Sequence, residues 1–289
     1  MISVIIPARN ERSVIARALS AMTTGAKCEQ LEIIVVCNGC TDDTATIAAA
    51  FGPTVRVIET EIGSKTHALN LGDRAASSFP RIYVDADVVI TFDSIQRLVS
   101  RLQRGDVLAV APLAKINLSG CSWLVRAFFD IRARLPSAQE GIGGSGVYAV
   151  SETGRRRFSD FPSLTADDGY VRVQFRPEER ETIVSAVSIV FAPRTTRDLL
   201  LIRTRSYYGT FELARLYPNL WKNRGESNHK TVLRLLKHPN LWFKVLIFCY
   251  INVIARCKAR ARFRAHNFFW ERDITSRSPL AMTSDMPGR

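Results

Sequence analysis

Acidic residues are scarce relative to basic ones in this 289-residue sequence, which has 27 Asp and Glu against 40 Lys and Arg and a net charge of +13. This imbalance favours an anionic partner: nucleic acid, lipid headgroups or a phosphate-bearing small substrate. The sequence is 46% hydrophobic and 23% charged, which excludes a disordered, collagenous or low-complexity chain. The length fits one large α/β domain with an appendage, or two modest domains.

Paired metal-binding cysteines are also missing. Of the six cysteines, Cys37 and Cys40 form a CxxC, but neither a second pair nor a nearby histidine follows. We therefore expect no zinc site, and we expect the cysteines to be reduced thiols. The apolar run 2–6 lacks a basic segment before it and stops at Pro7, so we expect no signal peptide and a cytosolic, reducing compartment.

Three further patterns are absent or weak. No internal period recurs, which excludes a solenoid or propeller, and no GxGxxG follows the first apolar run, which disfavours a dinucleotide-binding dehydrogenase. The longest apolar stretch, 241–255, would reach only about 22 Å as a helix, too short to span a bilayer core of about 30 Å. A dense basic run follows it, so we expect shallow association with an anionic membrane surface. The alternatives are a core helix and a helix that packs on a dimer partner.

The first half of the chain alternates short β-branched runs with amphipathic stretches, as repeated βα units do. Strands are predicted at 3–6, 31–36, 55–58, 81–84 and 107–111, and helices at 11–23, 44–51, 65–76 and 94–102, the last opened by Asp93 as a capping residue. The pattern is less regular after residue 115, with an aromatic amphipathic stretch at 123–135, a glycine-rich loop at 141–146 and a helix predicted at 165–175.

Two carboxylates, Asp85 and Asp87, follow the predicted strand 81–84. In an open α/β sheet this carboxyl edge is where ligands bind. Two such oxygens suit a hard divalent ion, Mg²⁺ or Mn²⁺, that also holds a diphosphate. The alternative is a solvated turn with helix-capping acids.

The order of the motifs is more specific than any one of them. The first strand ends in Pro-Ala-Arg-Asn-Glu at 7–11, the second in Cys-Asn-Gly-Cys-Thr-Asp-Asp-Thr at 37–44, and Gly-Ser-Lys at 63–65 precedes the DxD strand. Over residues 2–215 this series resembles the family 2 inverting glycosyltransferases. The resemblance implies an α/β fold of the glycosyltransferase A type, Rossmann-like, with a mostly parallel sheet flanked by helices. It divides the chain into a transferase domain at 1–215, with a donor half at about 1–112 and an acceptor half at about 113–215, and a helical, basic and apolar C-terminal region at 216–289.

The resemblance also implies roles for individual residues. The residues expected to bind a nucleotide-diphosphate sugar are Pro7, Ala8, Asn10, Glu11, Asn38, Lys65, Asp85 and Arg205, with Asp87 as the metal ligand. The loop at Gly143, Gly144 and Ser145 is expected to bind the acceptor, and Asp167 and Asp168 form the catalytic acid pair, with Asp168 as general base. Adjacent carboxylates raise the pKa of one another, which suits proton abstraction. The alternative interpretations are helix caps, a solvated lysine, a tight loop and a helix N-terminus that favours acids.

We therefore expect a metal-dependent enzyme that transfers one sugar, with inversion, to a lipid-linked or glycan acceptor in glycan or exopolysaccharide assembly. Ile202 and Ser206 stand where processive relatives have Gln and Trp, which argues against a polymer synthase. The expected location is the cytoplasmic face of the cell membrane, peripheral or shallowly inserted, without a nucleic-acid partner. The main alternative is a catalytically weak membrane scaffold that binds nucleotide sugars, because Cys37 replaces the usual acid at its position; nucleic-acid binding ranks last.

Overall fold

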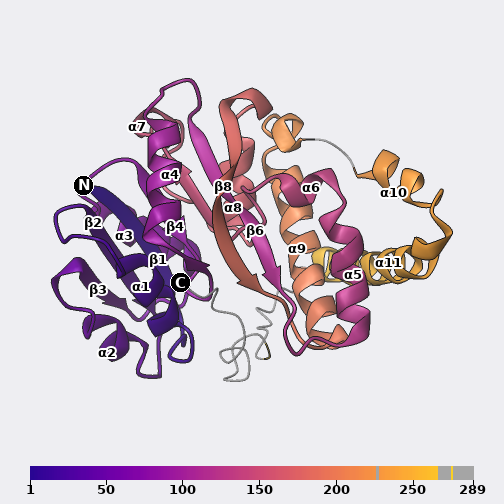
Figure 1. Ribbon diagram of the computed structural model, residues 1–289, viewed down its shortest axis with the longest axis horizontal. Coiled ribbons are helices and arrows are strands. Elements are labelled where there is room, and N and C mark those ends of the chain that lie inside the picture. Colours follow the sequence, from indigo (N-terminus) through magenta and orange to yellow (C-terminus); the bar gives the residue numbers. More distant parts are fainter. Residues whose placement is uncertain (226–227, 266–274, 276–289) are drawn as a thin grey trace.

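The computed structural model describes residues 1–225, 228–265 and 275, and its centre is one eight-stranded sheet with helices on both faces (Figure 1). The strand order is β3-β2-β1-β4-β7-β6-β8-β5. The strands are β1 (Ile2–Ala8), β2 (Leu31–Asn38), β3 (Val55–Thr60), β4 (Arg81–Val84), β5 (Val89–Ile90), β6 (Ala109–Asn117), β7 (Val147–Val150) and β8 (Arg180–Phe191).

The donor half of the sheet is parallel, as predicted. Parallel pairing joins β3, β2, β1 and β4 in that order without a break in register. Ile5 of β1, for example, lies opposite Ile34 of β2 and Tyr83 of β4. The apolar residues of β1, β2 and β4 are buried on both faces, which is why these strands read as near-continuous apolar runs, whereas the edge strand β3 is partly exposed. β7 then pairs antiparallel with both β4 and β6, whereas β6 and β8 are parallel. The sheet is therefore mixed, and the expected α/β class is confirmed.

Two apolar layers hold the helices to the sheet. One layer joins α1 and α4 to the sheet through residues such as Leu19 and Leu98, and the other joins α3 and α8 through Leu69 and Val171. The helices are α1 (Ile15–Thr23), α2 (Thr44–Ala49), η1 (Gly52–Thr54), α3 (Lys65–Ala75), α4 (Phe92–Leu102), α5 (Trp123–Ala133), α6 (Pro136–Gln139), α7 (Glu152–Arg155), α8 (Asp167–Val173), η2 (Pro177–Glu179), α9 (Thr196–Leu216), η3 (Trp221–Arg224), α10 (His229–Leu235), η4 (Pro239–Leu241) and α11 (Trp242–Arg264).

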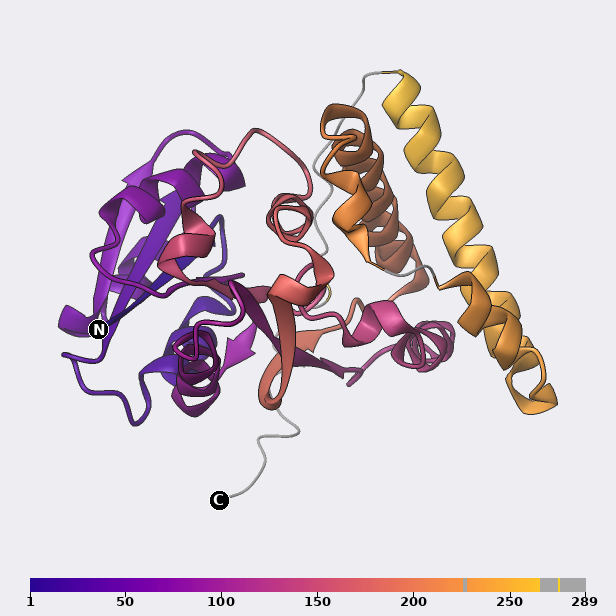
Figure 2. The same ribbon diagram turned by 90° about the horizontal axis from the view of Figure 1, so that it is seen from above.

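A third group of helices lies beyond β6, where α5, α9 and α11 pack together (Figures 1 and 2). α11 buries Ile247 and Ile251 against this group and exposes its opposite side. The proposed domain boundary at 215 falls at the last turn of α9, and residues 266–274 and 276–289 of the proposed C-terminal region lie outside the described residues.

Three details differ from the sequence prediction. α4 is capped by Thr91, whose hydroxyl accepts from the amide of Ser94, so Asp93 is not the cap. α1 begins at Ile15 rather than residue 11, because the amide of Glu11 donates to the Thr44 hydroxyl in a turn instead. α11 has 23 residues, about 34 Å at 1.5 Å per residue, so the predicted short helix was wrong in length. The helix continues beyond the apolar stretch 241–255 into basic turns, and the apolar pattern does not mark that extension.

Candidate active site

The two acids after β4 are held by a close approach of β7. The Asp85 amide donates to the Gly146 carbonyl at 2.8 Å. Gly146 has φ +65°, and a Cβ there would lie 2.5 Å from Val88 Cγ2. Only glycine fits this combination of positive φ and close contact. The turn that carries Asp85 and Asp87 is therefore fixed by the neighbouring strand.

Lys65 joins the two acidic segments. This first residue of α3 places Nζ 2.7 Å from Asp85 Oδ1 and 3.0 Å from Asp167 Oδ2. Burial disfavours the charged ammonium, but Asp167 and Asp85 outweigh it and raise the pKa of Lys65. A permanent positive charge thus lies between two carboxylates that are far apart in sequence.

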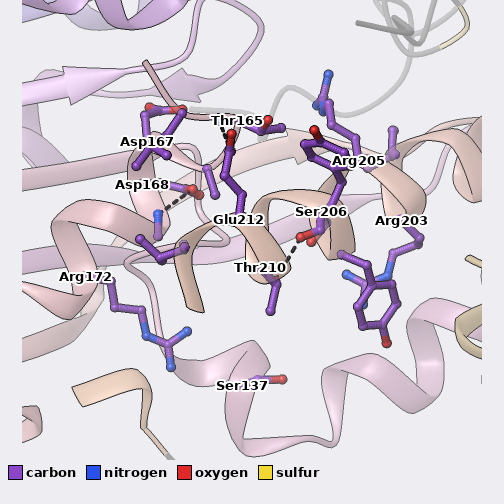
Figure 3. Close-up of a pocket in the computed structure, with 18 of the residues that line it drawn as sticks. Ser137, Thr165, Asp167, Asp168, Arg172, Arg203, Arg205, Ser206, Thr210 and Glu212 are labelled. Carbon is purple, nitrogen blue, oxygen red and sulfur yellow. Dashed lines mark hydrogen bonds between the residues drawn. The ribbon is translucent and has the colours of Figure 1, made fainter. Parts of the chain in front are cut away.

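Asp168 is the strongly perturbed acid of the site. Burial, followed by the negative charge of Asp167, raises its pKa from 3.8 to about 6, although Lys65 acts in the opposite direction. Its Oδ1 accepts a hydrogen bond from the Gly169 amide at 2.7 Å, which fixes the carboxylate at the start of α8 (Figure 3). Burial also raises the pKa of Asp85. A carboxylate with a pKa near neutrality is suited to accept a proton.

All four acids, Asp85, Asp87, Asp167 and Asp168, line one cavity of about 1640 Å³. Figure 3 shows Asp167 and Asp168 near Glu212 of α9, whose carboxylate accepts from the Thr165 amide at 2.8 Å. The cavity therefore has its floor at the sheet edge and its far wall on α9.

The loop after β1 forms another wall of the cavity. Asn10 has φ 52°, and its Oδ1 accepts from the Thr41 amide at 2.7 Å, which ties the ends of β1 and β2 together. Asn10 is thus not a cap of α1. In the turn before α2, Asp42 Oδ1 accepts from the Thr44 amide at 3.1 Å, although the N-cap residue of α2 is Asp43. Asn38, at the end of β2, is 3% exposed and borders the same cavity.

Most of the residues singled out from the sequence come together here. The ones that line the cavity are Pro7, Asn10, Glu11, Asn38, Lys65, Asp85, Asp87, Gly143, Asp167, Asp168 and Arg205.

Three predicted site residues do not line this cavity. Ala8 is 1% exposed and belongs to the core beneath the sheet, because alternate residues of a strand face opposite ways. Ser145 is fully buried, and its hydroxyl bonds to the backbone of Gly141 and Val147 as a brace of the glycine loop. Gly144 is not among the lining residues, and a Cβ on it would be 3.5 Å from Arg132 Nη2.

Several charged residues of the cavity were not predicted from the sequence, among them Arg132, Arg172, Arg203 and Glu212. Arg172 forms an ion pair with Glu140. Helical spacing offered a partial signal, since Arg172 follows Asp168 by one turn, and Arg132 follows the buried Phe128 by one turn. Nothing in the sequence indicates that α5 and α9 meet at this cavity.

The acids fit a divalent cation only in partnership with a substrate. Within the described residues, no group of three or more His, Cys, Asp or Glu side chains is arranged to hold a metal. One or two carboxylates completed by substrate phosphates and water are, however, the usual Mg²⁺ arrangement. Asp87 supplies one such carboxylate, and Asp85 is engaged by Lys65. The residues therefore fit a cation that arrives with a diphosphate.

Comparison with known proteins gives consistent results. The family model described as "Glycosyl transferase family 2" matches residues 3–147. A curated relative, 4,4'-diaponeurosporenoate glycosyltransferase of Staphylococcus aureus strain USA300, is 33% identical over 174 residues, which are 57% of this chain and 43% of the relative. The chain thus spans less than half the length of the curated relatives it matches.

Solved structures show the same fold. The mannosyltransferase PcManGT from Pyrobaculum calidifontis, in complex with GDP-Man and Mn²⁺, has a TM-score of 0.59 and 22% identity, covering 91% of this chain and 74% of that one. Glucosyl-3-phosphoglycerate synthase from Mycobacterium tuberculosis, with Mn²⁺, UDP and phosphoglyceric acid, has a TM-score of 0.55 and 22% identity, covering 74% and 78%.

Proposed function

This chain belongs to glycosyl transferase family 2, and on that premise we propose that it transfers one sugar from a nucleotide-diphosphate sugar to an acceptor hydroxyl, with inversion at the anomeric carbon. The observation that carries the proposal is the convergence of Asp85, Asp87 and Asp168 on one cavity. Similar folds in complex with GDP-Man or with UDP, each with Mn²⁺, support this class of donor.

The donor half of the cavity is proposed to bind the nucleotide. Asn10, Glu11 and Asn38 form its wall at the ends of β1 and β2. In this proposal Asp85 orients the ribose or sugar, and Lys65 and Arg205 bring positive charge to the leaving diphosphate. Asp87 would hold Mg²⁺ or Mn²⁺, which when bound neutralises charge on that diphosphate.

Asp168 is proposed to take the proton of the acceptor hydroxyl. The raised pKa of its carboxylate, about 6, is near the range in which a base works at neutral pH. The acceptor oxygen then attacks the anomeric carbon from the face opposite the diphosphate, so that a single displacement inverts the configuration. The proton moves from the acceptor oxygen to the Asp168 carboxylate as the new C–O bond forms and the bond to the diphosphate breaks.

α11 is proposed to hold the enzyme at an anionic membrane surface, where it would meet a lipid-linked or other membrane-borne acceptor. By length and composition, the helical segment Pro239–Arg264 could cross a membrane, and 22% of its most apolar window is buried. Its exposed apolar side chains recur at helical spacing and form what we call the α11 face: Trp242, Phe243, Leu246, Tyr250 and Val253. Arg256, Lys258 and Arg260 are exposed in the following turns. An apolar face beside a basic segment is typical of a helix that lies in the interface of the cytoplasmic leaflet.

The test of the transferase proposal is turnover. Candidate nucleotide sugars are incubated with the protein and MnCl₂ or MgCl₂, and release of the nucleoside diphosphate is measured with and without membrane extract as acceptor. Asp87→Ala and Asp168→Asn should each lower turnover by about a hundredfold or more. Asp160→Asn removes an exposed carboxylate that is paired with Arg74, outside the cavity, and should leave turnover unchanged.

Two results would contradict parts of this proposal. Full turnover by a folded Asp87→Ala or Asp168→Asn variant would remove that residue from the mechanism. Nucleotide binding without release of a nucleoside diphosphate from any donor would instead favour the binding-scaffold alternative.

A further inference from the structure

Two arginines from different helices border the cavity on the side away from β1 and β2. Arg132 is in the last turn of α5. Arg203 lies on α9 two residues before Arg205, and both are labelled in Figure 3. Arg203 Nη2 donates to Asn252 Oδ1 at 3.0 Å, and its guanidinium lies 5.0 Å from the Tyr207 ring centre. Its Nε is buried without a hydrogen-bond partner within the described residues.

Neither arginine is paired with an acid in the part of the chain that the structure describes. Within residues 1–225 and 228–265, no carboxylate forms an ion pair with Arg132 or Arg203. Burial, with the positive charge of Arg203 as a second cause, lowers the pKa of Arg132 to about 10. By contrast, the buried Arg155 has Asp73 at 2.6 Å. Desolvated cations without a counter-ion are costly, and an oxyanion ligand would offset that cost.

The glycine loop lies between Arg132 and the proposed base. A Cβ on Gly143 would lie 4.0 Å from Asp168 Oδ2, and one on Gly144 would lie 3.5 Å from Arg132 Nη2. Because neighbouring Cα atoms are 3.8 Å apart, the Arg132 guanidinium is within about 14 Å of the Asp168 carboxylate. An acceptor that spans about 14 Å can therefore reach from the base to Arg132.

Apolar side chains are part of the cavity wall beside Arg203 and further out. The Arg203 guanidinium lies 5.9 Å from the ring centre of Phe128, which stacks on Phe248. Val253 also lines the cavity, and it belongs to the exposed α11 face. The cavity thus runs from the acids, past the arginines, to the surface that carries the exposed apolar side chains. An acceptor with an apolar chain next to its charged group matches this order of surfaces.

We propose that Arg132 and Arg203 bind an oxyanion of the acceptor, so that the acceptor is an anionic amphiphile whose carboxylate or phosphate lies at these two guanidiniums. The identification of the bound anion as the acceptor rests on the proposed transferase function. The oxyanion site itself rests only on the two arginines. Guanidinium groups bind carboxylate and phosphate through paired, charge-assisted hydrogen bonds.

The test is a calorimetric titration with three twelve-carbon probes below their micelle concentrations: dodecyl phosphate, dodecanoate and dodecanol. Each is titrated into the full chain, with and without UDP or GDP plus MnCl₂, so that binding of the probes is separated from binding at the donor site. We expect at least one anion to bind tenfold or more tightly than dodecanol. Arg132→Gln should remove at least tenfold of that affinity. The matched control is Arg126→Gln, on the same helix but exposed and outside the cavity, which should change affinity less than twofold.

Each outcome decides a separate point. A preference for dodecyl phosphate identifies a phosphate-bearing acceptor, and a preference for dodecanoate identifies a carboxylate. Equal binding of dodecanol, or unchanged affinity in Arg132→Gln, overturns the proposal. Thermal unfolding separates a structural role: Arg132→Gln removes a desolvated cation and should not lower the midpoint, whereas a structural arginine would. Failure to bind any nucleotide would contradict the transferase proposal and leave the probe titration interpretable.

Discussion

Replacing Asp168 by asparagine is expected to lower activity and to raise stability, and the second effect depends on pH. Asparagine keeps the size of the side chain and an oxygen that can accept from the Gly169 amide, but it cannot take a proton from the acceptor. Loss of a general base lowers the rate by about 10²–10⁴-fold. In the wild type, kcat/KM should fall tenfold per pH unit below about pH 6, as Asp168 is protonated.

The stability effect follows from the same pKa. Asp168 has its pKa raised from 3.8 to about 6 on folding, so the native state holds this proton more tightly than the unfolded state does. Its ionisation therefore destabilises the native state increasingly between about pH 4 and pH 6, and fully above that. A difference of about two pKa units corresponds to about 3 kcal/mol. The variant does not titrate, so its advantage should grow by that amount from pH 4 to pH 8.

Thermal unfolding of both proteins at a series of pH values measures this difference. For a domain of this size, about 3 kcal/mol corresponds to roughly 6–12 °C in midpoint. Any constant offset from the amide cancels when the two pH profiles are subtracted. A difference that stays flat between pH 4 and pH 8 would refute the assignment of the raised pKa to Asp168. Unchanged turnover in the same variant would refute its role as base.

Three other changes test the fold and its surface. Asp73→Asn removes the acid that pairs with the buried Arg155 and should lower the free energy of unfolding in urea by about 3–5 kcal/mol; a loss below 1 kcal/mol would contradict the importance of this pair. Gly146→Ala forces a side chain to positive φ beside β4 and should cost about 1–3 kcal/mol and most of the turnover, so wild-type turnover in this variant would show that the DxD turn tolerates movement. Leu246→Glu should lower the affinity for phosphatidylglycerol vesicles, measured by co-sedimentation, at least tenfold, because burying a leucine contributes about 1.5–3 kcal/mol. Val184→Glu on β8, which is also exposed, should leave this affinity unchanged. Equal loss in both variants would contradict docking through α11.

The donor half could be predicted from the sequence because its signals are local. β4 has the predicted bounds, Arg81–Val84, and β1 and β2 differ from prediction only at their ends. A strand buried on both faces needs an unbroken apolar run, which is legible without knowledge of its neighbours. The two acids at the end of β4 then lie at the carboxyl edge of the sheet, where ligands bind.

The acceptor half was less predictable because its order depends on partners. β8, Arg180–Phe191, was not predicted: it exposes residues irregularly, and its register against β6 shifts between Pro112 and Leu113. This shift breaks the two-residue alternation by which a half-buried strand is recognised. No helix was predicted at α9 either, because its buried residues are few and spread over 21 residues.

A motif resemblance assigns the same role to several consecutive residues, whereas in the fold the side chains of those residues point in different directions. In β1 the alternation of the strand places Pro7 at the cavity and Ala8 in the core, although the resemblance assigned both to the nucleotide. The same argument explains why Arg132 was missed: it belongs to no motif, and only the packing of α5 beside α9 brings it to the cavity with Arg203. Cavity residues that belong to no motif, and that reach the cavity only through the packing of helices, can thus differ between enzymes that share the donor motifs. We infer that the acceptor preference of this chain is encoded at such positions rather than in the donor motifs.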